Sequence, residues 1–268
     1  MTGRMPGIRQ HVYDHWPRYV GIALANAALL LLILMVASQG WWAYALFAAA
    51  IWLVLFYFTA VGLLLAQRQG RSPDYAYLFA LGEITPTERF VQIEVGRRDA
   101  GIYLTTLLTT GKLTIIDLYN PQLTPNPTLR RARQRLLHPP PDPRRTWIAG
   151  SVDLIPLPDS SVPAIILHDT LSQFPQHGDR QRLLQEAYRI LAPGGRLLLS
   201  ERTRSLTNWL VLGPAANRLP EPDHWREMLR QAGFHPRQEQ PRHDITTCFR
   251  ADKAATPPEY QLAFKLDL

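Results

Sequence analysis

The sequence is poor in cysteine and, over one long stretch, has no charge at all. Cys248 is the single cysteine among 268 residues, so an intramolecular disulfide and a cysteine-ligated zinc site are both excluded. This fits a reducing compartment. From Tyr19 to Ala66, a stretch of 48 residues, there is no Asp, Glu, Lys, Arg or His. Beyond Ala66 the chain is ordinary mixed sequence, rich in Arg and Pro.

The charge-free stretch is too long for one membrane span and suits two. A helix that crosses the hydrocarbon core needs about 20 apolar residues. A polar turn at Ser38-Gln39-Gly40 divides the stretch, which predicts a hairpin over 19–66 with helices over 19–37 and 41–66. Aromatic residues typical of membrane interfaces flank both helices. They are Trp16, Tyr19, Trp41, Trp42 and Tyr44.

The arginines beside the hairpin predict its orientation. Arg4, Arg9 and Arg18 precede it, Arg68 and Arg71 follow it, and the turn is uncharged. Cationic flanks remain in the cytoplasm, so we expect a multi-pass membrane protein with both termini and the soluble domain cytoplasmic. Two alternatives remain, a buried helical hairpin in a soluble protein and a cleaved signal peptide. The apolar stretch is much longer than a signal core and lacks a small-residue cleavage pattern.

The chain is basic but contains no nucleic-acid-binding motif, which argues against a role in binding DNA or RNA. The net charge is +7, mostly from Arg. No motif of a DNA- or RNA-binding fold accompanies it, so we expect no nucleic-acid partner. A basic domain held near an anionic lipid leaflet gains about 1 kcal/mol per cation near the surface, and the bilayer is therefore the expected partner.

The remainder of the chain divides into segments around one domain. We expect a cytoplasmic N-terminal segment over 1–18, a connector over 67–89, an α/β domain over 90–250 and a C-terminal tail over 251–268. The connector is rich in Gly and Pro and contains an apolar patch, Tyr75–Leu81, expected to lie on the bilayer or on the domain.

Short apolar runs alternate with helical stretches within the domain. Continuous apolar runs are typical of parallel strands buried on both faces, and their alternation with helices predicts a doubly wound, mostly parallel sheet. The runs are Phe90–Val95, Leu113–Leu118, Thr146–Ala149, Ala164–Leu167 and Arg196–Ser200. The helices are expected over Gly101–Thr110, Thr128–Leu137, Asp179–Leu191 and Asp223–Ala232, and we expect Pro193-Gly194-Gly195 to be the turn that closes the third.

Polar residues follow the expected strands at the edge where ligands bind in doubly wound sheets. Glu94 ends the first strand and is followed by Gly96 and Gly101, Asp117 ends the second strand, and His168-Asp169 ends the fourth. A carboxylate placed like Asp117 can accept both hydroxyls of a ribose. A nicotinamide dehydrogenase is disfavoured because the Gly-x-Gly-x-x-Gly motif is absent.

Each of these residues also has a plainer interpretation. Glu94 could cap the next helix or pair with Arg97 or Arg98. Asp117 could be a turn residue, and His168-Asp169 could be polar residues at a loop entrance. The basic helix over Arg130–Arg135 is expected to be a solvated or membrane-facing surface.

Two segments carry a resemblance to a known family. They read GSVDLIPLPDSS, over residues 150–161, and LLQEAYRILAPGGRLLLSE, over residues 183–201. With the spacing of Glu94 and Asp117 before them, the chain from about 90 to 250 resembles the class I S-adenosylmethionine-dependent methyltransferases, in particular those with quinone, small-molecule or lipid substrates. The resemblance implies a seven-stranded sheet of order 3-2-1-4-5-7-6 in which the last-added strand is antiparallel.

The resemblance also implies roles for the strand-end residues. Glu94, Gly96 and Gly101 would line the amino-acid half of S-adenosylmethionine, and Asp117 would hold its ribose hydroxyls. The adenine would lie between Ser151, Val152 and Asp153. His168 and Asp169 would face the site of methyl transfer, with His168 the best candidate for a general base.

The chain departs from the family's pattern at three places. Where the family usually has glycines, this chain has Arg98 and Ala100, and Gly101 comes one place late; Ser151 replaces the usual acid. Two functions are therefore expected. The first is a membrane-anchored methyltransferase acting on a lipophilic or membrane-associated small molecule. The alternative is a catalytically inactive methyltransferase-like domain that serves as a structural or assembly subunit of a membrane complex.

Overall fold

The computed structural model describes residues 16–71, 74–96, 98–135 and 141–255. The chain forms two compact units. The first, here the helical unit, contains the chain up to Pro73 and an insertion, Ser205–Arg218; the second, here the sheet unit, contains Asp74–Arg204 and the chain from Leu219. Most of the expected N-terminal segment (1–15) and of the expected tail (256–268) lies outside the described residues.

The helical unit is built on a hairpin of two apolar helices, α2 (Trp16–Ser38) and α3 (Trp42–Arg71). Gly40 takes a positive φ of 77° in the turn between them, a conformation that favours glycine. The segments Val20–Ser38 and Trp42–Val61 are long and apolar enough to cross a membrane, and within the unit only 0% and 6% of them is buried. The chain itself therefore leaves these apolar side chains almost uncovered.

The apolar patch of the connector packs on the sheet unit. It forms α4 (Asp74–Leu81), in which Tyr75 and Leu78 are buried in the domain core. Of the two places expected for this patch, the domain is the one observed, because Leu78 packs together with core residues such as Phe90 and Leu198.

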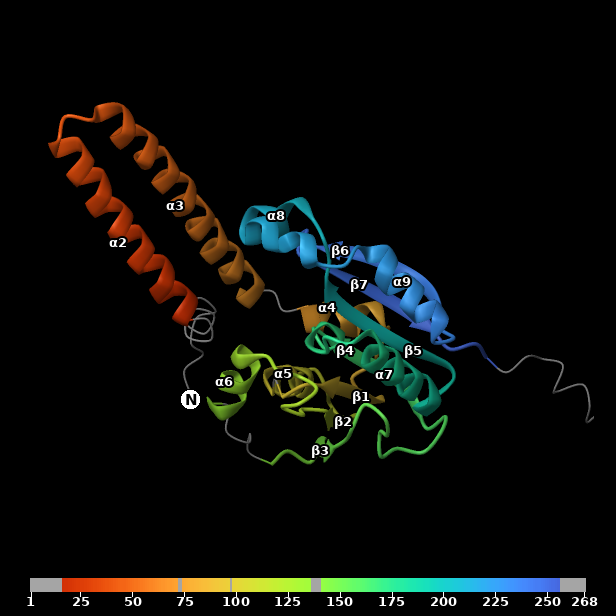
Figure 1. Cartoon of the computed structure of the whole chain (residues 1–268). Coiled ribbons are helices and arrows are strands. Elements are labelled where there is room, and N and C mark those ends of the chain that lie inside the picture. The colour runs from red at the N-terminus through yellow and green to blue at the C-terminus, as the bar shows by residue number, and fades with distance from the viewer. Residues whose placement is uncertain (1–15, 72–73, 97, 136–140, 256–268) are drawn as a thin grey trace, which may run out of the picture. The chain divides into compact units, whose positions relative to one another are not determined.

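The sheet has seven strands in the order β3-β2-β1-β4-β5-β7-β6 (Figure 1). β1 pairs in parallel with β2 and β4, whereas β7 is antiparallel to both β5 and β6, which confirms the order and the strand direction expected from the resemblance. The strands are β1 (Arg89–Glu94), β2 (Lys112–Asp117), β3 (Arg145–Ala149), β4 (Val162–His168), β5 (Leu191–Arg202), β6 (His235–Arg242) and β7 (Thr246–Asp252).

Helices cover both faces of the sheet, as a parallel sheet requires. Along β1 the side chains alternate: Val91 and Ile93 belong to the core beneath α7 and α9, and Phe90 to the core beneath α4 and α5. The helices, including the short 3-10 helix η1, are α5 (Asp99–Thr106), α6 (Pro127–Arg135), η1 (Leu171–Gln173), α7 (His177–Ile190) and α9 (Pro222–Gln231).

The Pro-Gly-Gly triplet does not close α7, contrary to expectation. The helix ends at Ile190 and β5 begins at Leu191, so residues 193–195 lie inside the strand. The pairing with β4 shifts across the triplet, and Gly194 has a φ of 74° and donates its N–H to the carbonyl of Lys253. The triplet is therefore a bulge, because Leu191 already enters the ladder opposite Val162.

The insertion between β5 and α9 was not anticipated from the sequence. It forms α8 (Leu206–Leu212) and the 3-10 helix η2 (Gly213–Arg218). It packs with α3 and belongs to the helical unit although the strand before it and the helix after it belong to the sheet unit.

Candidate functional site

The carboxyl ends of β1, β2 and β4 bring together the polar residues singled out in the sequence. Glu94 and Asp117 are direct partners in the β1–β2 register. His168 ends β4, which pairs with β1 on its other side. The strand order reverses between β1 and β4, and such a switch point is where doubly wound sheets bind ligands.

Asp117 is held by two donors. Arg133 of α6 donates from Nη1 to Oδ2 at 2.6 Å, and the backbone N–H of Tyr119 donates to Oδ1 at 3.0 Å. The guanidinium also stacks over the Tyr119 ring at 4.5 Å. The expectation that the whole basic helix faces solvent or the membrane is therefore wrong for Arg133, because this side chain turns inward to the carboxylate at the end of β2.

The loop after β1 has the backbone that a close ligand approach requires. Gly96 has a φ of 75°, which a residue with a Cβ adopts only with strain. A Cβ at Gly96 would also lie 2.9 Å from Nη1 of Arg133. Gly101 serves packing instead, since a Cβ there would collide with the side chain of Ile115 on β2. A Cβ at Gly101 would also lie 3.3 Å from Oε1 of Gln92, which lines the cavity described below.

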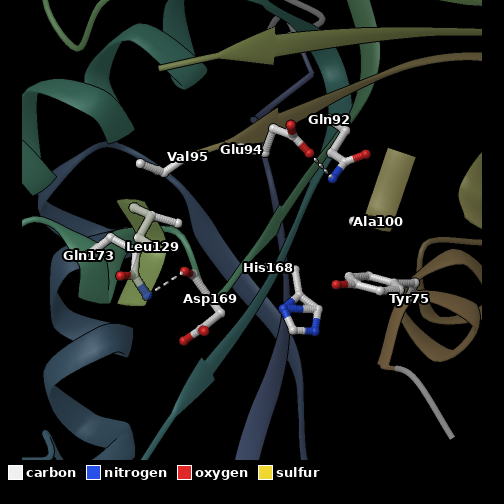
Figure 2. A pocket seen from close by; sticks show the side chains of 9 residues that line it. All are labelled: Tyr75, Gln92, Glu94, Val95, Ala100, Leu129, His168, Asp169 and Gln173. Atoms are coloured by element: carbon white, nitrogen blue, oxygen red, sulfur yellow. Dashed lines mark hydrogen bonds between the residues drawn. The ribbon is translucent and has the colours of Figure 1, made fainter. Parts of the chain in front are cut away.

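Glu94 is buried at the end of β1 beside a second polar side chain, Gln92. Only 3% of Glu94 is exposed, and its Oε2 accepts a hydrogen bond of 3.3 Å from Nε2 of Gln92. Figure 2 shows the two side chains next to each other on one wall of the cavity. Gln92 was not singled out in the sequence; its signal is an amide between the apolar residues Val91 and Ile93 of β1.

His168 faces an aromatic partner that the sequence did not suggest. The ring of Tyr75, on α4, lies 4.3 Å from the His168 imidazole, centroid to centroid, at an interplanar angle of 44°. Both side chains line the same cavity as Glu94 (Figure 2). The imidazole of His168 can take a proton from a molecule bound in this cavity. Tyr75 adds an aromatic surface with a hydroxyl group.

Asp169 occupies a strained turn directly after His168. Its φ is 50°, uncommon for a residue other than glycine. The carboxylate accepts a hydrogen bond from the Ser172 hydroxyl at 3.1 Å, and the Asp169 carbonyl accepts one from the Gln173 amide at 3.2 Å. These contacts hold the turn, and Asp169 lines the same cavity as His168.

A buried carboxylate, Glu201 on β5, fixes the same turn. Its Oε1 accepts the backbone N–H groups of Thr170 and Leu171, at 2.9 and 2.6 Å, and its Oε2 accepts that of Ser172 at 3.4 Å. Burial raises the pKa of Glu201, and the negative charge of Asp169 raises it further. Glu201 is the last residue of the segment LLLSE in β5, and its available signal in the sequence was a carboxylate shortly after a run of leucines.

The segment expected beside the adenine is divided between surface and core. Ser151 is exposed and caps its own turn, with its hydroxyl accepting the N–H of Leu154 at 3.1 Å. Val152 is buried in the domain core. Asp153 is exposed and pairs with Arg182 of α7 at 2.5 Å. The three residues follow β3 as expected, but only Ser151 and Asp153 present side chains to solvent.

The residues fit S-adenosylmethionine in their chemistry, while α6 fills the space. Gly96 and Asp117 offer a close backbone approach and a carboxylate at ribose-reaching spacing. The cavity between β1 and β4, however, has a volume of only about 10 Å³, room for about one water molecule. Leu129 of α6 lines it, and Arg133 covers Asp117 and Gly96. In this structure α6 therefore lies over residues expected to hold the cofactor.

Comparisons with known proteins show what the sheet unit is similar to. Residues 95–199 match the family described as "Methyltransferase domain". The carboxy-S-adenosyl-L-methionine synthase of Actinobacillus succinogenes is 32% identical over 121 residues, which are 45% of this chain and 47% of that protein. The chain thus spans about half the length of this curated relative.

Solved structures share the fold at low identity. A SAM-dependent methyltransferase from Aquifex aeolicus has a TM-score of 0.51 at 16% identity, covering 67% of this chain and 89% of that one. The [4+2]-cyclase SpnF has a TM-score of 0.50, also at 16% identity, covering 68% and 80%. Because one of the two is called a cyclase, the fold alone does not fix the reaction.

The family match and the sheet topology agree on the same part of the molecule, the sheet unit. Residues 95–199 are thus similar to the methyltransferase domain family, and the sheet unit has the fold of S-adenosylmethionine-dependent methyltransferases, a similarity that implies S-adenosylmethionine as the cofactor.

Proposed function

We propose that this chain is a membrane-anchored S-adenosylmethionine-dependent methyltransferase that acts on a lipophilic small molecule. The observation that carries the proposal is the meeting of Glu94 and Asp117 on one side of the strand switch point with the His168–Tyr75 pair on the other. One side offers groups for a cofactor, and the other offers a proton acceptor and an aromatic wall for a second molecule.

When bound, the cofactor supplies a methyl group already activated on a sulfonium, so positioning is the main task of the protein. In this assignment Asp117 accepts the ribose hydroxyls in place of Arg133, and Glu94 faces the amino-acid half. His168 would take the proton that the bound acceptor loses. Tyr75 and the closed cavity exclude water.

Membrane anchoring is supported by the hairpin. Both helices meet the length and composition of a span and keep their apolar side chains uncovered within the chain. A soluble protein rarely exposes apolar patches of this extent. The arginines that flank the stretch favour a cytoplasmic sheet unit. A methyltransferase held there would meet acceptors dissolved in the bilayer, such as quinones or lipids.

A binding and transfer assay tests the proposal. We expect calorimetry on the full chain in lipid nanodiscs to show saturable S-adenosylmethionine binding. With a membrane lipid extract and methyl-labelled cofactor, label should appear in the organic phase. His168→Ala should slow transfer by about 100-fold and leave cofactor binding unchanged. His235→Ala is the matched control, because His235 is exposed on β6.

The closed cavity also favours the second function, an inactive domain that serves as a structural or assembly subunit. Arg133 forms an ion pair with Asp117, the carboxylate on which ribose binding would depend. If neither the wild type nor Arg133→Ala binds S-adenosylmethionine, the enzymatic proposal is wrong and the structural role takes its place.

A further inference from the structure

The insertion Ser205–Arg218 has the composition of a membrane surface. From Ser205 to Asn217 it has no charged residue, and Arg204 and Arg218 flank it directly. This repeats, over 13 residues, the charge pattern of the hairpin. The stretch is too short to span the hydrocarbon core. Apolar helices of this kind with cationic flanks are typical of elements that lie in the membrane interface.

The first turn of α8 directs its large apolar side chains outward. Ser205 caps the helix by accepting the N–H of Asn208 on its hydroxyl at 3.0 Å. Leu206 and Trp209, three residues apart and so on one helix face, are 72% and 45% exposed, whereas Asn208 is buried. A short helix that buries an amide and exposes Leu and Trp has the opposite polarity to a helix on a water-exposed protein surface.

Among the described residues, this exposure is concentrated in the helical unit. Among the described residues of the sheet unit, the large hydrophobic side chains that are exposed are Ile102 and Leu154. Every other one belongs to the hairpin or to α8. The insertion therefore shares the surface chemistry of the hairpin and not that of the domain whose strand leads into it.

The contact partner of α8 fixes its expected depth. Within the helical unit α8 packs against α3, and Figure 1 shows it beside the C-terminal half of that helix. The arginines Arg68 and Arg71 end α3 and are expected at the cytoplasmic boundary. An element packed near that end lies at the level of the headgroups.

Within the sheet unit, the residues next to the unit boundaries lie near the carboxyl end of β5. The ends of the insertion are pinned together where β5 finishes, since the N–H of Arg204 donates to the carbonyl of Pro220 at 2.8 Å. Asp74, which follows the hairpin, accepts hydrogen bonds from Thr246 at 2.7 Å and Ser200 at 3.3 Å. Ser200 is the register partner of His168.

We propose that α8 and η2 form an interfacial membrane-docking element, in which Leu206 and Trp209 enter the lipid between headgroups and acyl chains and Arg218 faces lipid phosphates. With the hairpin it gives the helical unit a second attachment to the bilayer surface. The proposal rests on the membrane anchor proposed above.

Fluorescence in vesicles tests the docking element. Leu206→Cys and Trp209→Cys are each labelled with the environment-sensitive dye NBD in the full chain, reconstituted in vesicles of phosphatidylcholine and phosphatidylglycerol. The native Cys248 is buried and its thiol pKa is raised to about 12, which confines labelling to the new thiol. Leu154→Cys is the matched control, an equally apolar and 63% exposed leucine of the sheet unit.

We expect blue-shifted emission at both α8 sites, quenched by about half or more by lipids that carry a shallow nitroxide, and a water-like, unquenched signal at residue 154. Emission at the α8 sites that matches residue 154 overturns the proposal. So does a blue shift without lipid quenching, which would mean that protein covers α8. Phe47→Cys on α3 separates the two failures: if it also escapes quenching by deep nitroxide lipids, the anchor itself is wrong.

Discussion

At the scale of single residues, Asp117 is the carboxylate on which cofactor affinity should depend most. It would exchange its bond to Arg133 for two bonds to ribose hydroxyls, and hydrogen bonds to a charged group are worth about 1.5–3 kcal/mol each. We expect Asp117→Ala to weaken S-adenosylmethionine binding at least tenfold, as about 1.4 kcal/mol corresponds to one decade. Calorimetry measures it, and Asp223→Asn, an exposed carboxylate on α9, should bind like the wild type.

Glu201 should make the stability of the domain depend on pH. Its pKa is raised in the fold, by burial and then by Asp169, whereas an unfolded glutamate titrates near about 4.3. Between the unfolded pKa and the folded pKa, which is about 8, the folded state binds more protons than the unfolded state. Stability therefore falls as pH rises. We expect the thermal unfolding midpoint to decrease as the pH is raised from 5 to 8.

The variant Glu201→Gln isolates this effect, because the amide oxygen can still accept the N–H groups of Thr170 and Leu171 and cannot ionise. The decline with pH should become shallower in Glu201→Gln and stay as steep in Glu227→Gln, whose carboxylate is exposed. Parallel pH profiles for the wild type and Glu201→Gln would show that Glu201 is not the group responsible.

At the scale of elements, α6 lies over residues expected to hold the cofactor. Leu129 lines the cavity, and Arg133 bonds Asp117 in a half-buried ion pair. A cofactor that must displace α6 binds with an affinity reduced by the fraction of molecules that are open. We expect Arg133→Ala to tighten S-adenosylmethionine binding, by about threefold to tenfold if the ion pair contributes about 1 kcal/mol.

The control for α6 is Arg130→Ala, on the same helix and exposed, which should leave the affinity unchanged. Weaker binding in Arg133→Ala would mean that the guanidinium contacts the cofactor and does not compete with it. A second readout is independent of affinity: saturating cofactor should increase cleavage of the wild type by trypsin within α6 and have little effect on Arg133→Ala.

At the scale of the whole molecule, the hairpin should place its turn on the side of the membrane opposite to the sheet unit. Gln39→Cys, in the turn after α2, should react with an impermeant maleimide added outside intact cells, and Leu154→Cys should react only after the cells are opened. The physical reason is that translocating the arginine-rich flanks costs more than translocating the uncharged turn. Labelling of residue 154 from outside would reverse the topology.

The sequence by itself determined the order of elements and the edge of the sheet where the site lies. A strand buried on both faces is a run of apolar residues, and such a run is visible in the sequence alone. The predicted ends of β1, β2 and β4 therefore lie within two residues of the observed ends. The charge-free stretch set the hairpin in the same way, because its length and lack of charge are properties of the chain and not of its partners.

Only the tertiary structure decided which side chains meet. Arg133 looked like one cation among several, and its bond to Asp117 depends on how α6 crosses the end of β2. Tyr75 was part of an apolar patch until α4 packed on the sheet beside His168. Likewise α8 joined α3 rather than the domain around it. Contacts between residues far apart in sequence leave no local pattern, since each partner alone is compatible with many environments.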